Sequence, residues 1–136
     1  MSFDAHRHFH DELNDLKVRL LTMSGEAEAA LSLAVEALLE RDIEKAQRVI
    51  KGDRVIDSME VEIEEQCIHL LALQQPMARD LRMLTSALKI ANDLERVADL
   101  ATNIGEDVVF LVEGRSIKHH AEHRGESRES PAPSSR

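Results

Sequence analysis

Two acidic pairs with the same spacing are the residues in this chain that could do chemistry. Asp53 and Asp57 stand in GDRVIDSME, and Glu95 and Asp99 stand in IANDLERVADLATNIGE. Residues four apart lie about one helical turn from each other, so each pair directs its carboxylates to one side of a helix. Carboxylate oxygens without Cys or His beside them suit Mg²⁺, Mn²⁺, Ca²⁺ or ferric iron. Each pair therefore predicts half of a metal site.

These two pairs differ from the other acid pairs of the chain, which are ordinarily solvated, in their distance from the expected turn between the second and third helices. Other pairs with the same spacing include Asp11/Asp15, Glu36/Glu40 and Glu60/Glu64. If the chain turns near residue 75, the first pair lies about 20 residues before the turn and the second about 22 after it, a mismatch of roughly 3 Å at 1.5 Å per residue. The two pairs are therefore predicted to lie level on neighbouring antiparallel helices.

Further polar residues stand close to the acidic pairs. Four carboxylates at one height repel each other, and a cation removes that repulsion. Asn92, Asn103 and Glu106 fall near the same helical face and could extend the coordination shell. Glu60 continues the first row, which would allow more than one ion.

Two glycines adjoin the acidic row inside the expected helices. Gly52 and Gly105 would each cost roughly 1 kcal/mol relative to alanine in a helix interior. Close approach of a helix or a metal would explain them, and simple tight packing explains them equally well.

The elements that position the acids are three long amphipathic helices. Apolar residues advance by alternating steps of four and three, which indicates helices over about 8–41, 43–73 and 77–112. Asp42 is expected to cap the second helix, and QQP at 74–76 to end it. Aromatic residues are only 2% of the chain, which favours helices over a β-sandwich. The inward residues are expected to be Phe9, Leu13, Leu16, Leu20, Met23, Ala27, Ala30, Ala34, Ile43, Ala46, Ile50, Ile56, Met59, Ile63, Cys67, Leu70, Met77, Leu81, Leu84, Leu88, Ala91, Leu94, Ala98 and Ala101.

The fold expected from this pattern is all-α. Residues 6–112 form an antiparallel up-down three-helix bundle, and residues 113–136 form a polar, disordered tail without apolar periodicity.

Composition limits the partners and the compartment. The net charge of −9 and the lack of a Lys/Arg cluster argue against nucleic-acid binding. The longest late apolar run, VVFLV, is far shorter than a membrane span, so no membrane insertion is expected. A single cysteine, Cys67, and an N-terminus without an apolar signal segment make the cytoplasm the expected location.

Long stretches of the chain resemble one known family. The segments LALQQPMARDLRMLTSALKIANDLERVADLATNI, ALLERDIEKAQRVIKGDRVIDSMEVEIEEQC and HFHDELNDLKVRLLTMSGEAEAAL look like the PhoU family of phosphate-transport accessory proteins, over about residues 6–112. The resemblance implies a cytoplasmic regulator that acts on the phosphate ABC transporter ATPase and its sensor histidine kinase. It also implies multinuclear metal clusters held by (E/D)xxxD motifs, matched here by Asp53 with Asp57 and Glu95 with Asp99. Divalent or ferric ions are expected, with Fe, Mn, Mg and Zn as the candidates.

The chain departs from the family pattern in one respect. Family members usually carry two such bundles in tandem, whereas this sequence holds one. It is therefore either a single-repeat form that restores the double bundle as a homodimer, or a truncated or frame-shifted product. Apolar residues left over outside one seam, among them Val18, Leu21, Val97 and Leu100, favour the homodimer.

Two other classes of function are considered for the sequence. An enzyme is not expected, because the helical part has no Glu-x-x-His pair, no phosphate-binding Gly-rich loop and no Ser–His–Asp set. The alternative is an acidic helical adaptor whose carboxylates bind nothing.

The histidines allow a second kind of metal site. Those at 6, 8 and 10 and at 119, 120 and 123 could chelate a transition metal, but solvated termini are the preferred interpretation. His69, which stands four residues after Glu65, is interpreted as a boundary residue of the bundle.

Overall fold

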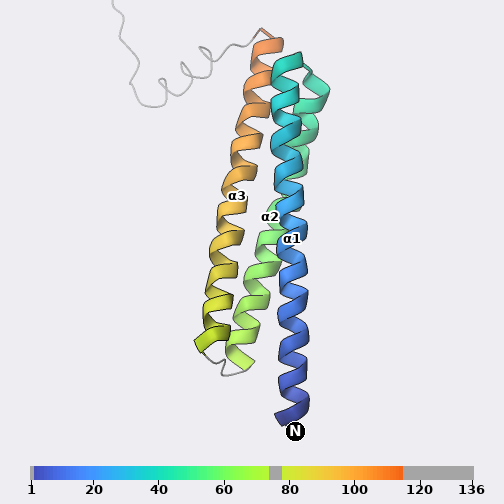
Figure 1. The fold of residues 1–136 in the computed structure, drawn as a ribbon. Helices are drawn as coiled ribbons and strands as arrows, with labels where there is room; N and C mark the ends of the chain where they lie inside the picture. Colours follow the sequence, from blue (N-terminus) through green and yellow to red (C-terminus); the bar gives the residue numbers. More distant parts are fainter. Residues whose placement is uncertain (1, 74–77, 115–136) are drawn as a thin grey trace, which may run out of the picture.

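Three helices packed side by side make up the described protein (Figure 1). The computed structural model describes residues 2–73 and 78–114. Helix α1 spans Ser2–Glu40, α2 spans Ile43–Leu73 and α3 spans Ala78–Val112. Helices α1 and α3 run in one direction and α2 in the other, and each helix contacts both of the others. The all-α up-down bundle is confirmed, whereas QQP at 74–76, Met77 and the tail from 115 onward lie outside the described residues.

Helix α1 begins earlier than the sequence pattern predicted. It starts at Ser2 rather than near residue 8. The difference has a simple cause, because periodicity detects a helix only where apolar residues recur, and the first residues are polar. Nothing in SFDAHRH breaks a helix, since neither proline nor glycine occurs there, so an established helix continues through it.

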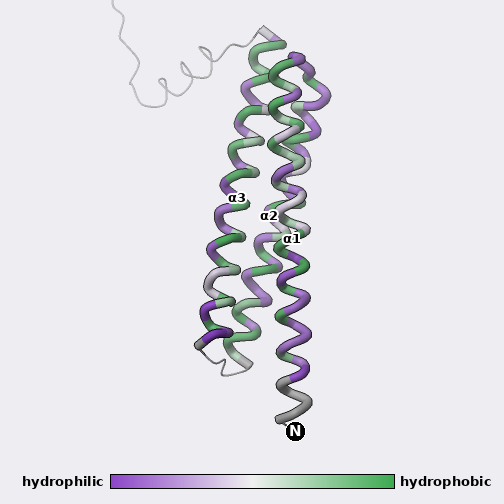
Figure 2. The backbone as a smooth tube through the Cα atoms, viewed as in Figure 1, coloured by the Kyte–Doolittle hydropathy of each residue, from purple (hydrophilic) through white to green (hydrophobic). Residues whose placement is uncertain are grey.

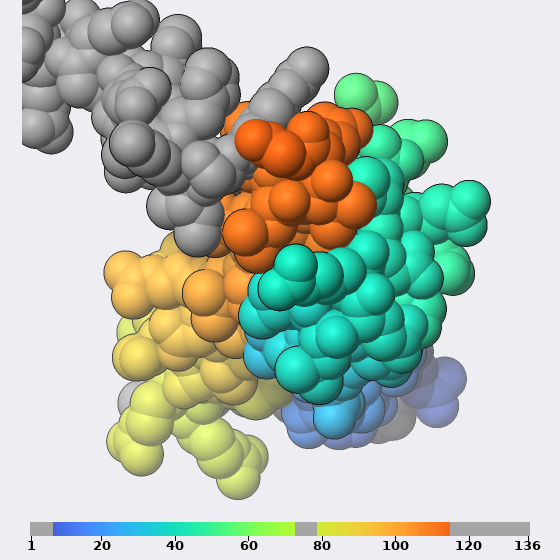
Figure 3. Space-filling view, turned by 90° about the horizontal axis from the view of Figure 1, so that it is seen from above, coloured from blue at the N-terminus to red at the C-terminus, as the bar shows by residue number. Residues whose placement is uncertain are grey.

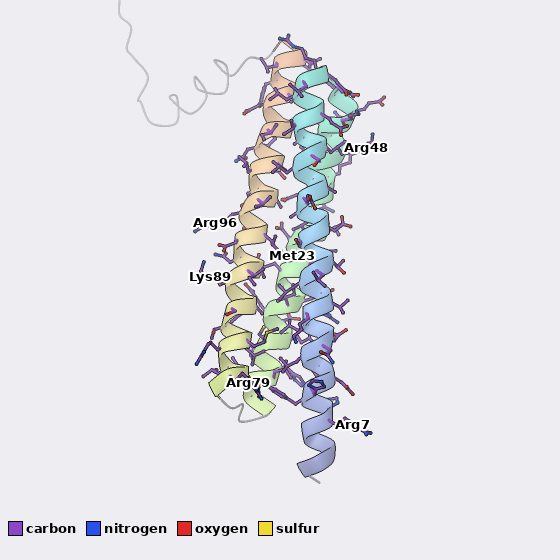
Figure 4. All side chains as sticks on the ribbon, in the orientation of Figure 1. Arg7, Met23, Arg48, Arg79, Lys89 and Arg96 are labelled. Carbon is purple, nitrogen blue, oxygen red and sulfur yellow. The ribbon has the colours of Figure 1, made fainter. Side chains whose placement is uncertain are left out.

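Small and aliphatic side chains fill the space between the helices, as the low aromatic content required. Hydrophobic and hydrophilic residues alternate along each helix (Figure 2). Leu16, Met23, Ile63 and Leu84 are completely buried, and Met23 points into the bundle while Arg48 points outward from it (Figure 4). Most of the predicted inward residues are buried or half-buried. Among the side chains described at 7–72 and 79–114, none that is polar or charged is fully buried.

The predicted core was wrong at one position and incomplete at others. Leu81 is 43% exposed although it stands three residues before the buried Leu84, because it lies in the first turn of α3, at the end of the packed stripe. Further buried residues were missed, and they are Ala37, Val49, Ala87 and Val108.

The connection from α1 to α2 is fixed by the residues that the sequence singled out. Arg41 adopts a left-handed backbone conformation (φ 54°), and the amide of Asp42 donates to the carbonyl of Ala37 at 2.9 Å, which together close α1. Asp42 Oδ1 then accepts a hydrogen bond from the amide of Lys45 at 3.2 Å, so Asp42 caps α2 as predicted. Figure 3 shows this connection beside the end of α3.

One of the two interior glycines marks a close approach of helices. A Cβ added to Gly105 on α3 would lie 3.0 Å from the carbonyl oxygen of Ala46 and 3.3 Å from Ile50 Cγ1 on α2. Gly52 has nothing within 4 Å of the corresponding position. Close packing therefore accounts for Gly105 but not for Gly52.

This contrast predicts opposite effects of the same substitution. Gly105→Ala should destabilise the bundle by about 1–3 kcal/mol, because the added methyl group meets a backbone atom that cannot rotate away. Gly52→Ala should stabilise it by about 0.5–1 kcal/mol, because alanine favours the helix and the space is open. Urea unfolding of both variants measures the two effects, and equal effects of the same sign would contradict the helix contact.

Candidate metal centre

Two acidic residues of α2 occupy positions that normally belong to the core. Ala46, Asp53, Glu60 and Cys67 follow each other at intervals of seven, and the first and last of them are fully buried. A repeat of seven returns each of these residues to the same side of the helix. Asp53 and Glu60 are therefore turned toward α3 and are half-buried, whereas Asp57 is exposed at the edge of the same contact.

Helix α3 brings its own acidic pair to this part of α2, as the level of the two pairs predicted. Partial burial, a hydrogen bond with Asp99 and the charges of Asp99, Glu60 and Asp57 raise the pKa of Glu95 to about 7. A carboxyl with that pKa carries a proton for part of the time at neutral pH, and the hydrogen bond places that proton between Glu95 and Asp99.

Asp53 is the innermost oxygen donor of the group. Partial burial, followed by the charge of Asp57, raises its pKa, while the hydroxyl of Thr102 acts in the opposite direction by hydrogen bonding to the carboxylate. Its Oδ1 atom is buried and accepts no hydrogen bond from the described residues. Thr102 was missed at the sequence level, although its position three residues after Asp99 places it on the same face of α3.

Glu60 joins the cluster from the second core position of α2. Desolvation raises the pKa of Glu60, and the charges of Glu64, Asp57 and Asp99 add to the effect. The structure thus brings together five carboxylates from two helices, and these are Asp53, Asp57, Glu60, Glu95 and Asp99. We refer to them as the acidic cluster.

None of the ion pairs among the described residues joins a positive side chain to the acidic cluster, although Arg54 lines a hollow beside Asp57. These ion pairs join other acids to Lys45, Arg19, Lys89 and the histidines. Lys89 and Arg96 of α3 point outward (Figure 4). Carboxylates at close range repel each other when no positive charge is near, so a cation bound between them would stabilise their ionised forms.

The less central candidates lie at the margin of the cluster. Asn92, Asn103 and Glu106 are exposed. Glu106 instead lines a separate apolar hollow of about 590 Å³ between α2 and α3, together with Ile50, Val109 and Phe110.

The acidic cluster offers the type of ligand atoms that a metal ion needs, but its carboxylates do not surround one common point. Among residues 2–73 and 78–114, no three His, Cys, Asp or Glu side chains are placed so that they could hold an ion as they stand. An all-oxygen set with one buried, unpartnered oxygen matches the chemistry of Mg²⁺, Mn²⁺ or ferric iron.

Comparison with known protein families supports the resemblance seen in the sequence. The model of the PhoU domain matches residues 20–108, which is well over half of the chain. The chain belongs to the PhoU family. Both acidic pairs of the cluster fall inside the matched PhoU domain.

Alignment with named PhoU relatives shows what share of their length this chain covers. The chain is 44% identical over 107 residues to a phosphate-specific transport system accessory protein PhoU homolog from Aquifex aeolicus, covering 79% of this chain and 48% of that protein. It is 40% identical over 96 residues to PhoU of Escherichia coli strain K12, covering 71% and 40%. The chain thus spans about half the length of the curated PhoU relatives it matches, or somewhat less.

Solved PhoU structures share the bundle. The crystal structure of PhoU from Pseudomonas aeruginosa superposes with a TM-score of 0.76 at 40% identity, covering 78% of this chain and 51% of that one. The phosphate transport system regulatory protein PhoU from Streptococcus pneumoniae superposes with a TM-score of 0.70 at 34% identity, covering 74% and 48%.

The matched relatives are named as accessory and regulatory proteins of phosphate transport. Within the described residues, none of the helices has both the length and the hydropathy needed to cross a membrane.

Proposed function

We propose that this chain is a metal-binding regulator of phosphate uptake and phosphate-starvation signalling. The transport role rests on the family, whose matched members are named as accessory proteins of the phosphate-specific transport system. The phosphate ABC transporter ATPase and its sensor histidine kinase are the proposed partners, and the cytoplasm is the proposed location. The proposed domain is the bundle of residues 6–112, followed by the polar tail of 113–136.

The observation that supports metal binding most strongly is the acidic cluster itself. It places five carboxylates without a positive partner around a buried, unpartnered oxygen of Asp53. Asp53, Asp57, Glu95 and Asp99 would hold the ion, and Glu60 would allow a second ion. Iron, manganese, magnesium and zinc are the candidate ions, and the all-oxygen donors favour the harder ones.

The mechanism that follows is indirect. Phosphate and the acidic cluster are both anionic, so the carboxylates repel phosphate rather than bind it. Any response to phosphate must pass through bound metal or through the partner proteins. Bound metal would neutralise the cluster and change the surface that α2 and α3 offer to a partner.

A reporter of phosphate starvation tests the function. In a bacterial strain that lacks its own PhoU, expression of this chain should lower the output of a phosphate-starvation promoter in high phosphate. Asp57→Ala with Asp99→Ala should abolish that effect at equal protein level. A wild-type chain that is folded and abundant but leaves the reporter unchanged would refute the role. Equal activity of the double variant would favour the adaptor without metal.

The proposed partner of the bundle itself is a second copy of the chain. Ile90, Val97, Ile104 and Leu111 follow each other at intervals of seven on α3. Ile104 packs against a cluster made of Ala34 of α1, Val49 of α2 and Ala101 of α3. Ile104 stands five residues after Asp99, which is about 140° around the helix, so the stripe is turned away from the acidic cluster. Ile90 is 46% exposed and Leu111 is 39% exposed.

Neighbouring residues widen this stripe into an apolar face. Leu100 of α3 is 52% exposed and Leu21 of α1 is 73% exposed, and Val35 and Leu38 of α1 are also exposed. An apolar face along two helices of a bundle favours a symmetric dimer that covers it. A dimer would supply two bundles, in keeping with the chain spanning about half of its relatives.

The dimer predicts a solution mass of twice the chain mass of 15.3 kDa. Leu21→Glu with Leu100→Glu should convert the protein to monomers, because two charged groups cannot be buried without partners. Val55→Glu with Val61→Glu is the matched control, since these exposed valines lie on the outer side of α2. Sedimentation equilibrium measures the mass, and a monomeric wild type would contradict the dimer.

A further inference from the structure

A second cluster of metal-ligating side chains lies between α1 and α2, away from the acidic cluster. It forms a groove of about 620 Å³ near the end of α2. The groove is lined by His8, Asp11, Glu12, Asp15, Arg19, Glu62, Glu65, Gln66 and His69. Unlike the acidic cluster, it combines imidazole nitrogens with carboxylate oxygens.

Glu12 is the centre of this groove. Its Oε2 atom lies 2.6 Å from Nε2 of His8 on the same helix and 3.9 Å from Nε2 of His69 on α2. The Glu12 side chain is only 20% exposed, whereas the two imidazoles are 64% and 52% exposed. Two histidines from antiparallel helices thus approach one oxygen atom of a single, largely covered carboxylate.

Hydrogen bonds between α1 and α2 fix the position of one helix along the other beside Glu12. Gln66 of α2 donates from Nε2 to the backbone carbonyl of Glu12 at 3.2 Å and to Asp15 Oδ2 at 3.2 Å. Arg19 closes the groove farther along α1 by pairing with Asp15 at 3.2 Å and with Glu62 at 3.5 Å. The backbone positions that carry Glu12 and His69 are therefore held level with each other.

We infer that His8, Glu12 and His69 form a binding site for a transition metal of the Zn²⁺ class. Imidazole nitrogens with a carboxylate are a ligand set that Zn²⁺ takes in proteins. Zinc bonds of about 2.0–2.1 Å in tetrahedral geometry require ligand atoms about 3.3 Å apart. The observed 2.6 Å and 3.9 Å lie on either side of that value. As they stand, the three side chains are not placed to hold an ion, so binding requires the exposed imidazoles to rotate toward Glu12.

The groove offers a fourth ligand and a favourable charge. Glu65 lies one turn before His69 on α2, and it lines the same groove. The chain thus presents His-x-x-x-Glu on α1 opposite Glu-x-x-x-His on α2, which are complementary because the helices are antiparallel. Acidic residues outnumber Arg19, the sole Lys or Arg lining this groove, so a cation is attracted and an anion is repelled.

The site is independent of the proposed function. It uses other residues, another pair of helices and a softer ligand set than the acidic cluster. Bound metal would connect the first turns of α1 to the end of α2. If no metal binds there, the two contacts of Glu12 with His8 and His69 are partly exposed ion pairs that contribute little to the free energy of unfolding. Addition of zinc would then leave the stability of the protein unchanged.

Zinc titration of the full-length chain tests the site. Wild-type protein should bind Zn²⁺, measured by competition with a chromophoric zinc indicator, and zinc should raise its Tm. His8→Ala and His69→Ala should each weaken binding by about tenfold or more. His10→Ala is the matched control, because His10 is exposed on the same helix and does not line the groove. It should bind zinc as the wild type does.

Two further measurements separate this site from other binding. Asp57→Ala with Asp99→Ala removes any zinc that the acidic cluster takes. The histidine variants are therefore also compared in that background, where His8→Ala and His69→Ala should still weaken zinc binding by about tenfold or more. Co²⁺ should give the visible absorption of a tetrahedral site in the wild type, and Glu12→Gln should reduce it. Equal zinc affinity in wild type, His8→Ala and His69→Ala, or an equal loss in His10→Ala, would overturn the inference.

Discussion

Purified protein with Asp57→Ala and Asp99→Ala is expected to contain almost no metal, whereas the wild type retains it. The two substitutions remove one exposed carboxylate from each side of the acidic cluster, and bridging ions then lose ligands from both helices. Loss of outer partners of a metal site commonly costs 10–100-fold in affinity, so loss of two direct ligands should cost about 100-fold or more. Elemental analysis and titration with Mn²⁺ measure the effect.

The control for this experiment is a pair with the same spacing elsewhere. Glu36→Ala with Glu40→Ala removes the same charge from α1, where both glutamates pair with Lys45 at 3.0 Å and 2.9 Å. This variant should keep its metal. Circular dichroism should show intact helices in both variants, because the four residues are exposed. Unchanged metal content in the first variant would eliminate the proposed centre.

Metal-free protein is expected to lose stability as the pH rises from about 4.5 to beyond 7. Glu95 has a pKa of about 7 in the folded protein and 4.5 as its ordinary value, so the folded state holds a proton that the unfolded state has released. Stability from this proton is complete below the ordinary value and disappears as the pH rises through 7. Asp53 and Glu60, whose pKa values are also raised, act in the same direction.

The size of this effect is on the order of 1–2 kcal/mol, because one pKa unit corresponds to about 1.4 kcal/mol and partial solvent exposure weakens the interaction. Glu95→Gln should flatten the dependence of the unfolding free energy on pH. Asp93→Asn is the control, since Asp93 is an exposed acid of the same helix that contacts Lys89. Saturating Mn²⁺ should also remove the slope in the wild type. Stability that rises with pH in the metal-free wild type would contradict the raised pKa of Glu95.

The sequence predicted the helices because their packing has a simple period. Apolar residues at steps of three and four require one buried stripe per helix, and Asp42 supplies a local cap that needs no tertiary contact. The start of α1 escaped this reasoning, because polar residues carry little periodic signal. The exposure of Leu81 escaped it, because Leu81 keeps the apolar period but lies in the first turn of α3.

The acidic cluster could be predicted in part for the same reason. A fixed rise per residue sets the height of Asp53, Asp57, Glu95 and Asp99 once the helices are antiparallel. Which neighbours belong to the cluster depends on rotation about the helix axes, and that rotation is decided by packing. The structure thus joined Glu60 and Thr102 to the cluster and left Asn103 exposed.

The residue pattern by itself determined three antiparallel helices and two acidic pairs at one level, because both follow from local geometry repeated along the chain. Only the tertiary structure decided that Gly105 lies against Ala46, that Asp53 keeps a buried oxygen without a partner, and that His8 and His69 approach Glu12. These contacts join residues far apart in the sequence. Their distances depend on how closely each pair of helices packs and how each is rotated, and side-chain volumes throughout the core set both.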